Sequence, residues 1–392
     1  MMALWTVIKK RLSKWPAAAR LNARLKCYYV KRTYRQLCAE VPDAGRAAFQ
    51  PESRDRRWPW RVLFVGTDWE QDRSGIIQGL RSVVTEAHLF ENEPGKPGQK
   101  WPKDRSEVEP ARRRNAALLR ETVQRLLANG PLHAVVGQMW NLSMPHVSLA
   151  DLRRQGIRIV NISMDDRHAF LGWKLEDGDR SGTSGLIGAL DLACTAAAEC
   201  VRWYERRNVP AIYLPEASDP ELFRPMELPK QYDVCFVGAC YGLRQRIVET
   251  LERSGVRVQA YGSGWSKGRL PTDAVPELFA RSKIVLGCGT ILHCEDFYAL
   301  KMRDFDGPMS GSLYMTHNNP DLHELFVPEK EIVLFDSLPE LVQKARYYLS
   351  HPEERECIAL AGRQRAMRDH TWKQRFQTLF ASLDIVRPIA EN

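Results

Sequence analysis

The 392-residue sequence has no run of about 18 uninterrupted apolar residues, the length that a helix needs to cross a bilayer. Its most apolar helical window, residues 186–198, is interrupted by Asp191. The apolar start, residues 1–8, comes before the charges of residues 9–11, whereas a secretory signal peptide has its charges first. We therefore expect no membrane-spanning helix, no secretory signal and a cytoplasmic location.

The nine cysteines do not form the pattern of a disulfide scaffold or a zinc site. Their number is odd, no two are spaced as CxxC, and none of the close pairs has zinc-site spacing with histidines nearby. We expect reduced, buried thiols and no metal site. The sequence also lacks a P-loop, a GxSxG nucleophile elbow and a GxGxxG fingerprint, so the commonest nucleotide-binding and hydrolase signatures are absent.

The net charge of +9 is concentrated near the N-terminus. Residues 1–61 contain 15 lysines and arginines but only four acidic residues, whereas the rest of the chain carries 42 basic and 44 acidic side chains. The basic character therefore belongs to an N-terminal extension, residues 1–57. Because the body shows neither a basic patch nor a nucleic-acid motif, we expect no nucleic-acid partner.

Apolar residues of this extension recur at three- and four-residue steps from about Leu4 to Glu40, which predicts a helix that Pro16 breaks or restarts. Basic residues fill the positions between them. Such a helix suits an anionic membrane surface, where each nearby lysine or arginine contributes about 1 kcal/mol. It equally suits a helix that packs on its own body or on a second subunit. Peripheral contact of residues 1–40 with the inner face of the plasma membrane is therefore one of two open interpretations.

The body alternates between strand-like and helix-like segments in two series. Buried-strand patterns such as RVLFVGT at 61–67 define the first series, and YDVCFVG at 232–238 opens the second. Between the two series, residues 215–231 hold four prolines and no periodicity. The pattern predicts two doubly wound α/β domains, residues 58–215 and 232–350, joined by a hinge at 216–231. We expect residues 351–392 to form helices that pack back across the hinge, and residues 91–110 to form a mobile loop or lid.

Ligands of such folds bind beyond the carboxyl ends of the strands, so the cleft between two domains is the expected active site. In FVGACYGLRQR, Gly238 and Gly242 allow close backbone approach, and a helix begins near Leu243. Its free N–H groups and Arg244 would suit a diphosphate, although a simple tight turn would look similar.

A second candidate segment is KMRDFDGPMSG at 301–311. Lys301 and Arg303 could neutralise phosphate charge, and a carboxylate at Asp306 could accept both hydroxyls of a ribose. The alternative is a surface helix start with an aspartate cap. The Asp304-x-Asp306 spacing also matches the acidic pair of some metal-dependent sugar transferases, but it opens a predicted helix and is a frequent coincidence.

The candidate catalytic residues are Asp165, Asp166 and His168, at the carboxyl end of a predicted strand of the first domain. Either carboxylate or the imidazole could act as a base or orient a sugar hydroxyl. Helix capping and loop hydrogen bonds are the alternative. We expect the acceptor to lie near these residues, the segment 66–68 and Trp140.

The second half of the chain resembles the CgeB-like (spore-maturation type) glycosyltransferases, members of the GT-B group of nucleotide-sugar enzymes. Four segments carry the resemblance in order: LPEASDPELFRP (214–225), YDVCFVGACYGLRQRIVETL (232–251), LKMRDFDGPMSGSLYMTHNNPDLHELF (300–326) and EIVLFDSLPELVQKARYYLSHPEERECIALAGRQRAMRDHTW (331–372). In the first half, RVLFVG (61–66), MDD (164–166) and DLACT (191–195) add to it.

The resemblance implies an α/β fold of the GT-B type, with two Rossmann-like domains that face a cleft and a nucleotide-sugar donor bound by the second domain. In related enzymes the acid of an R-x-F-E pattern holds the ribose, and here Asp306 occupies that position. Tyr298 stands where many retaining relatives have a further glutamate. The implied donor-binding residues are Gly238, Arg244, Lys301, Arg303, Asp306 and Gly311. Enzymes of this group generally need no metal, because helix dipoles and basic side chains stabilise the leaving diphosphate.

The sequence thus predicts a glycosyltransferase that moves a sugar from a nucleoside-diphosphate donor to a glycan or lipid-linked acceptor. Two other functions remain open. One is a nucleotide-sugar epimerase or a phosphorylase, and the other is a non-catalytic protein that binds glycans or nucleotides or acts as a scaffold.

Overall fold

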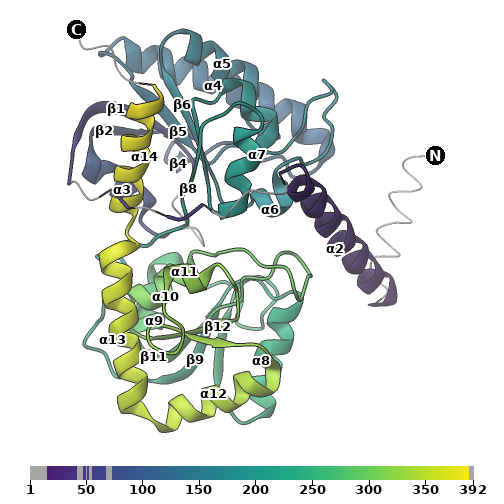
Figure 1. Ribbon diagram of the computed structural model, residues 1–392, viewed down its shortest axis with the longest axis vertical. Coiled ribbons are helices and arrows are strands. Elements are labelled where there is room, and N and C mark those ends of the chain that lie inside the picture. The colour runs from purple at the N-terminus through teal and green to yellow at the C-terminus, as the bar shows by residue number, and fades with distance from the viewer. Residues whose placement is uncertain (1–15, 42–46, 50, 53–54, 68–72, 388–392) are drawn as a thin grey trace.

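The computed structural model describes residues 16–41, 47–49, 51–52, 55–67 and 73–387. Two α/β units lie one above the other along the long axis, and the C-terminal helices run along one side of both (Figure 1). Each unit is built on a parallel sheet. This architecture agrees with the fold class that the sequence predicts.

The first sheet has six parallel strands in the order β2-β1-β5-β6-β7-β8. The strands are β1 (Trp58–Val65), β2 (Val84–Leu89), β5 (Ala134–Gly137), β6 (Arg158–Ser163), β7 (Leu192–Thr195) and β8 (Ala211–Tyr213). Its helices are α3 (Ile76–Val83), α4 (Val108–Leu127), α5 (His146–Arg154), α6 (Asp166–Ala169) and α7 (Val201–Glu205). Residues 62–65 are fully buried, as expected for a central strand covered on both faces.

The second sheet has five parallel strands in the order β10-β9-β11-β12-β13. The strands are β9 (Tyr232–Val237), β10 (Val258–Tyr261), β11 (Ser282–Leu286), β12 (Leu313–His317) and β13 (Val333–Phe335). Its helices are α8 (Leu243–Arg253), α9 (Val275–Ala280), α10 (Arg303–Met309), α11 (Leu322–Leu325) and α12 (Leu338–Ser350).

The two last helices connect the units. Helix α13 (Pro352–Asp369) packs on α10 of the second unit, and α14 (Trp372–Val386) packs on α3 of the first. Thr371 begins α14 with a capping box, in which its hydroxyl and the side chain of Gln374 each accept a backbone N–H. The Nε1 of Trp372 donates to the Ser74 hydroxyl at 2.8 Å, so the junction of α13 and α14 is anchored in the first unit.

The segment 91–110 is more ordered than the sequence suggests. It contains an antiparallel hairpin of β3 (Glu91–Glu93) and β4 (Lys96–Pro97). The side chain of Gln99 donates to the carbonyl of Gln138 at 2.8 Å, and the Asn115 amide holds the backbone of Lys100 through two bonds of 2.9 Å. These anchors fix the expected mobile loop against the first sheet, because they satisfy its backbone groups.

Helix α2 (Pro16–Ala39) touches both units (Figure 1). Leu37 is buried in the core of the first unit, whereas Tyr34 packs against both Trp203 of the first unit and Phe297 of the second. An ion pair joins Lys31 to Asp296. The second half of this helix therefore packs on its own body, one of the two interpretations left open by the sequence. The positions from Leu4 to Trp15 lie outside the described residues.

None of the helices in the described part of the chain is both long and apolar enough to cross a membrane.

Candidate functional site

A cavity of about 510 Å³ lies where the carboxyl ends of both sheets face each other. The first unit contributes residues that follow β1, β5 and β6, and the second contributes residues that follow β9 and precede α10. Its lining is Gly66, Thr67, Gln99, Trp101, Gln138, Trp140, Ile162, Met164, Asp165, Glu216, Gly238, Ala239, Tyr241, Arg244, Lys301, Met302 and Arg303. This is the expected position for a ligand of doubly wound folds.

The loop between β9 and α8 begins with Gly238, whose φ of 155° is rarely adopted by residues with a side chain. A Cβ atom at this position would lie 3.1 Å from Nη2 of Arg303 and 3.3 Å from Nη1 of Arg244. Glycine therefore lets two guanidinium groups approach the same stretch of backbone. Gly242, with φ of 57°, precedes the first turn of α8.

The two guanidinium groups of Arg244 and Arg303 are close together and largely buried. Nη1 and Nη2 of Arg244 reach the carbonyls of Ala239 and Cys288 at 3.4 Å, and the Nε atoms of both arginines have no partner. Burial lowers the pKa of Arg303, and the charge of Arg244 lowers it further. Among the described residues, no carboxylate forms an ion pair with either side chain, although the charges of Asp304 and Asp306 oppose the lowering of the pKa of Arg303. Two desolvated like charges without a direct ion-pair partner are unfavourable, so this corner is suited to a multiply charged anion.

Lys301 and Asp165 face each other from the two units, with Nζ 3.5 Å from Oδ1. Burial opposes ionisation of Asp165, but the Lys301 ammonium and His168 outweigh it, and the pKa of Asp165 lies below its usual range. Asp165 is thus an ionised carboxylate at the cavity, in a place that the sequence analysis expected.

Asp166, the second predicted catalytic residue, does not line the cavity. Its side chain is 2% exposed and accepts hydrogen bonds from the hydroxyls of Ser163 and Thr183 at 2.6 Å and of Tyr204 at 3.1 Å. Because these donors saturate the carboxylate, Asp166 fastens α6 to the sheet. The physical reason is periodicity, since neighbouring side chains at a helix start point in different directions.

His168 lies behind Asp165 rather than in the cavity lining. Its Nε2 is 3.9 Å from Oδ1 of Asp165, and burial lowers its pKa. The imidazole is therefore placed to support Asp165, and the predicted direct contact with substrate has no support in this geometry.

Two predicted donor-binding residues, Asp306 of α10 and Gly311 beyond its C-terminal end, also lie outside the lining. Asp306 is 6% exposed within the helix. Gly311 has φ of 73° just after the C-terminal end of α10, where a Cβ would lie 3.0 Å from Pro225. Arg303 is at the first turn of this helix, so Gly311 is about two turns further on, where it follows the C-terminal end of the helix.

Glu216 is a lining residue to which the sequence analysis gave no role. It follows β8, is 3% exposed, and its Oε2 has no hydrogen-bond partner. Burial raises its pKa to about 8, with Asp304 and Asp165 adding to the rise and Lys301 opposing it. Glu216 comes shortly after the end of β8, as Asp165 comes shortly after the end of β6, and this position near a strand end is the signal that could have found it.

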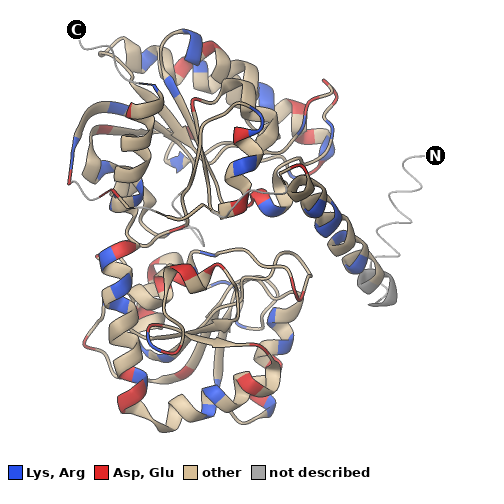
Figure 2. Cartoon of the chain, viewed as in Figure 1, with Lys and Arg blue, Asp and Glu red and all other residues tan. Residues whose placement is uncertain are grey.

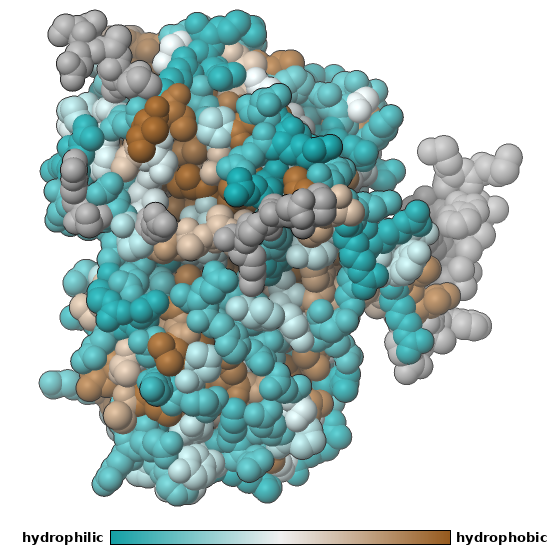
Figure 3. Space-filling view, viewed as in Figure 1, coloured by the Kyte–Doolittle hydropathy of each residue, from teal (hydrophilic) through white to brown (hydrophobic). Residues whose placement is uncertain are grey.

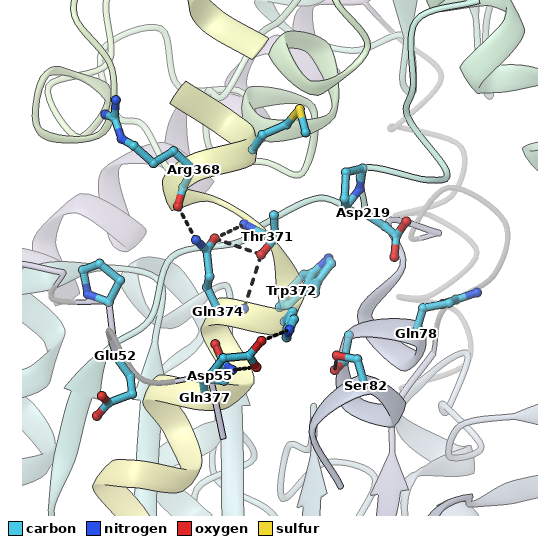
Figure 4. A pocket seen from close by; sticks show the side chains of 15 residues that line it. Glu52, Asp55, Gln78, Ser82, Asp219, Arg368, Thr371, Trp372, Gln374 and Gln377 are labelled. Carbon is cyan, nitrogen blue, oxygen red and sulfur yellow. Dashed lines mark hydrogen bonds and ion pairs between the residues drawn. The ribbon is translucent and has the colours of Figure 1, made fainter. Parts of the chain in front are cut away.

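Another cavity, of about 630 Å³, lies beside the junction of α13 and α14 (Figure 4). Helix α3 and the hinge residues Asp219 and Pro220 also line it. Its polar side chains largely bond to one another. Gln374 bonds to Thr371, and Asp55 accepts from Lys373 at 2.7 Å and from Gln377 at 2.8 Å. This cavity is therefore a joint between the units, without the uncompensated charge that marks the cavity between the sheets.

Comparison with known proteins agrees with this geometry. A family model described as glycosyl transferase-like matches residues 244–381, about a third of the chain. No curated protein sequence matches the chain.

Solved structures with a similar fold include sucrose-phosphate synthase from Thermosynechococcus elongatus, with TM-score 0.55, 10% identity, and coverage of 82% of this chain and 100% of that one. HepE from Anabaena, solved with UDP-glucose, has TM-score 0.57 and 12% identity over 83% of this chain and 99% of its own. A glycosyltransferase from Rickettsia africae has TM-score 0.55 and 9% identity over 86% of this chain and 100% of its own. The neighbours confirm the predicted GT-B fold, and the family model supports the predicted glycosyltransferase domain.

Proposed function

We propose that this chain, which has the GT-B fold and a glycosyl transferase-like domain over residues 244–381, transfers a sugar from a nucleoside-diphosphate donor to a glycan acceptor. The observation that carries the proposal is the pair of guanidinium groups of Arg244 and Arg303 beside Gly238, whose buried Nε atoms have no hydrogen-bond partner. Within the GT-B group, the order of the four sequence segments in the second half favours the CgeB-like subtype.

The arginine pair would hold the diphosphate of the donor. As the anomeric C–O bond breaks, negative charge grows on the leaving diphosphate, and preorganised cations in a water-poor cavity stabilise that charge. The N-terminal end of α8, an 11-residue helix, adds a positive dipole end at the same loop. These groups supply the charge stabilisation that a metal ion would otherwise supply, so we propose a metal-independent transfer.

The acceptor would lie against the wall from the first unit. Trp101 and Trp140 meet edge to face, with ring centroids 5.6 Å apart, and Gln99 and Gln138 lie beside them. Aromatic faces next to amide groups can pack against the apolar face of a sugar ring and bond to its hydroxyls. Of the segment 66–68 that the sequence analysis assigned to the acceptor, Gly66 and Thr67 line the cavity, and Asp68 lies outside the described residues.

The test is release of nucleoside diphosphate from a panel of nucleotide sugars, which starts with UDP-glucose because HepE was solved with it. We expect one donor family to be turned over, and R303A to lose most of the activity. The matched control is R253A on α8, because Arg253 is exposed and pairs only with Glu249 among the described residues. Turnover of no donor, together with no stabilisation by any nucleotide, would contradict the proposal and favour a non-catalytic protein.

A lipid-linked or surface acceptor at an anionic membrane is the further part of the proposal, and helix α2 supports it. Leu21, Leu25, Tyr28 and Tyr29 are 46–60% exposed, on the helix face opposite to the one that packs on the body. The helix has six basic residues and no acidic residue, and Figure 2 shows several blue Lys or Arg positions on the coloured part of its ribbon. Figure 3 shows hydrophobic side chains beside hydrophilic ones on this protruding helix. Apolar side chains flanked by positive charge are the pattern of interfacial helices.

Sedimentation with vesicles tests this part. The full chain should bind vesicles that contain phosphatidylserine and not vesicles of phosphatidylcholine alone, and Y28S/Y29S should weaken the binding. The control is L360S on α13, since Leu360 is 58% exposed far from α2 in the sequence. Equal binding of Y28S/Y29S and the control would contradict a membrane role for α2.

A further inference from the structure

Glu216 lies at the point where the chain leaves the first sheet and crosses to the second. Arg375 of α14 fixes this point, because its Nε donates to the carbonyl of Pro215 at 2.8 Å and its Nη2 donates to the carbonyl of Glu216 at 3.1 Å. The backbone that carries the carboxylate is therefore held rigidly. The side chain lines the cavity, and its Oε2 is buried without a hydrogen-bond partner.

The other acidic groups around this part of the cavity are already engaged. Asp166 is saturated by hydroxyls, Asp304 accepts from the backbone N–H of Lys301 at 2.7 Å, and Asp165 faces Lys301 at 3.5 Å. Of the two carboxylates that line the cavity within the described residues, Glu216 alone has a buried oxygen with no partner. A buried carboxyl oxygen without a partner is costly, so it points to a group that arrives with the substrate.

We infer that Glu216 is the base that accepts the proton of the acceptor hydroxyl, an inference that rests on the proposed transferase function. The O–H bond of the acceptor breaks and its proton passes to the Glu216 carboxylate, while the hydroxyl oxygen forms a bond to the anomeric carbon. The bond from that carbon to the diphosphate breaks, and its electron pair leaves on the diphosphate oxygen beside Arg244 and Arg303. After product release the proton passes from Glu216 to water. Because the acceptor oxygen displaces the diphosphate directly, in line with the bond that breaks, the configuration at the anomeric carbon is inverted.

The charges around Glu216 fit this role. Lys301 and Arg375 carry positive charge near it, Asp165 and Asp304 carry negative charge, and Tyr213 lies in the strand before it. Burial, followed by the effects of Lys301, Asp304 and Asp165, places the pKa of Glu216 at about 8. A base of that strength is better matched to neutral pH than Asp165, whose pKa is lowered. The ionised fraction of Glu216 rises with pH, so the rate should rise as the pH approaches about 8.

The experiment measures the turnover number and its pH profile in the full chain for wild type, E216Q, E216D and the control E221Q, whose exposed side chain lies five residues further along. We expect E216Q to lose about 100- to 10,000-fold in turnover and to lose the rise with pH, while UDP stabilises it as it does wild type. E216D should keep part of the activity with a displaced pH profile, and E221Q should behave as wild type.

Three results would overturn the inference. E216Q with wild-type turnover and an unchanged pH profile would exclude the base while leaving the transferase intact. A product with retained anomeric configuration would do the same. A wild-type chain that turned over no donor would overturn the proposed function together with this inference. Where E216Q does not fold, K301M gives an independent test. The Lys301 ammonium lowers the pKa of Glu216, so without it the turnover number must increase at a higher pH than in wild type.

Discussion

The two walls of the cavity carry different chemistry. The wall from the second unit presents Arg244 and Arg303, two cations without a direct ion-pair partner among the described residues, beside a glycine loop. The opposite wall presents two tryptophans, amides and the carboxylate of Asp165, and Glu216 lies at the crossing between the units. In the function that we propose, one wall would hold the charged leaving group and the other the neutral, hydroxyl-rich acceptor. The side chains at the strand ends of two similar α/β units would then divide the reaction between the walls.

The largest expected effect comes from removal of the cationic wall. In R244A/R303A, two charge-assisted contacts to a diphosphate are lost at about 1.5–3 kcal/mol each, which corresponds to roughly 100- to 10,000-fold weaker nucleotide binding. Titration of UDP by calorimetry measures this loss. Nucleotide binding that falls less than tenfold would place the diphosphate elsewhere.

A stability effect of intermediate size should mark Asp166 as structural. D166N replaces an oxygen that accepts from Ser163, Thr183 and Tyr204 with a donor group, so we expect unfolding free energy to fall by about 1–3 kcal/mol. Urea unfolding measures the change. Nucleotide affinity should stay at the wild-type value, and a loss of turnover at full occupancy and full folding would instead return Asp166 to the catalytic set.

A smaller effect is expected when the charge of the cationic wall is kept and its geometry is changed. R303K retains one positive charge but loses the planar fork that matches phosphate oxygens, so nucleotide binding should weaken by about tenfold. Comparison of R303K with R303A in the same titration separates charge from geometry. Equal losses in the two variants would show that the fork, and not the charge, carries the affinity.

The smallest effect concerns the carboxylate wall. Asp165 raises the pKa of Glu216. In D165N the turnover number should therefore begin to increase at a lower pH, by less than about one pH unit. K301M should move this increase in the opposite direction, because Lys301 lowers the same pKa. The pH dependence of turnover in both variants gives the signs, and shifts in the same direction would contradict the assignment.

The sequence predicted the order of strands and helices because buried parallel strands leave continuous apolar runs. These runs end in glycine or polar residues, and those ends predicted where the candidate site lies. Gly238, Arg244, Lys301 and Arg303 lie at such ends, and the structure brings them to one cavity. Their mutual distances could not be read from the sequence. Asp165 and Lys301 are 136 positions apart, and their approach depends on how the two units face each other.

The surroundings of other residues could not be predicted, because burial is a property of the fold. Asp165 and Asp166 are neighbours of the same type, yet one faces the cavity and the other is saturated by hydroxyls from three parts of the chain. Gly311 belongs to a family-like motif but serves to end α10. The backbone position of Glu216 depends on Arg375, 159 positions away, and its pKa depends in part on Lys301, 85 positions away. The sequence near Glu216 shows neither contact.

The division of labour between the two walls is tested most directly by titration of UDP into wild type, R244A/R303A and E216Q in parallel. The account predicts that E216Q binds UDP as wild type does and that the arginine variant loses at least 100-fold in affinity, since two charge-assisted contacts correspond to about that loss. Equal affinity of all three proteins, or loss of binding in E216Q alone, would contradict it.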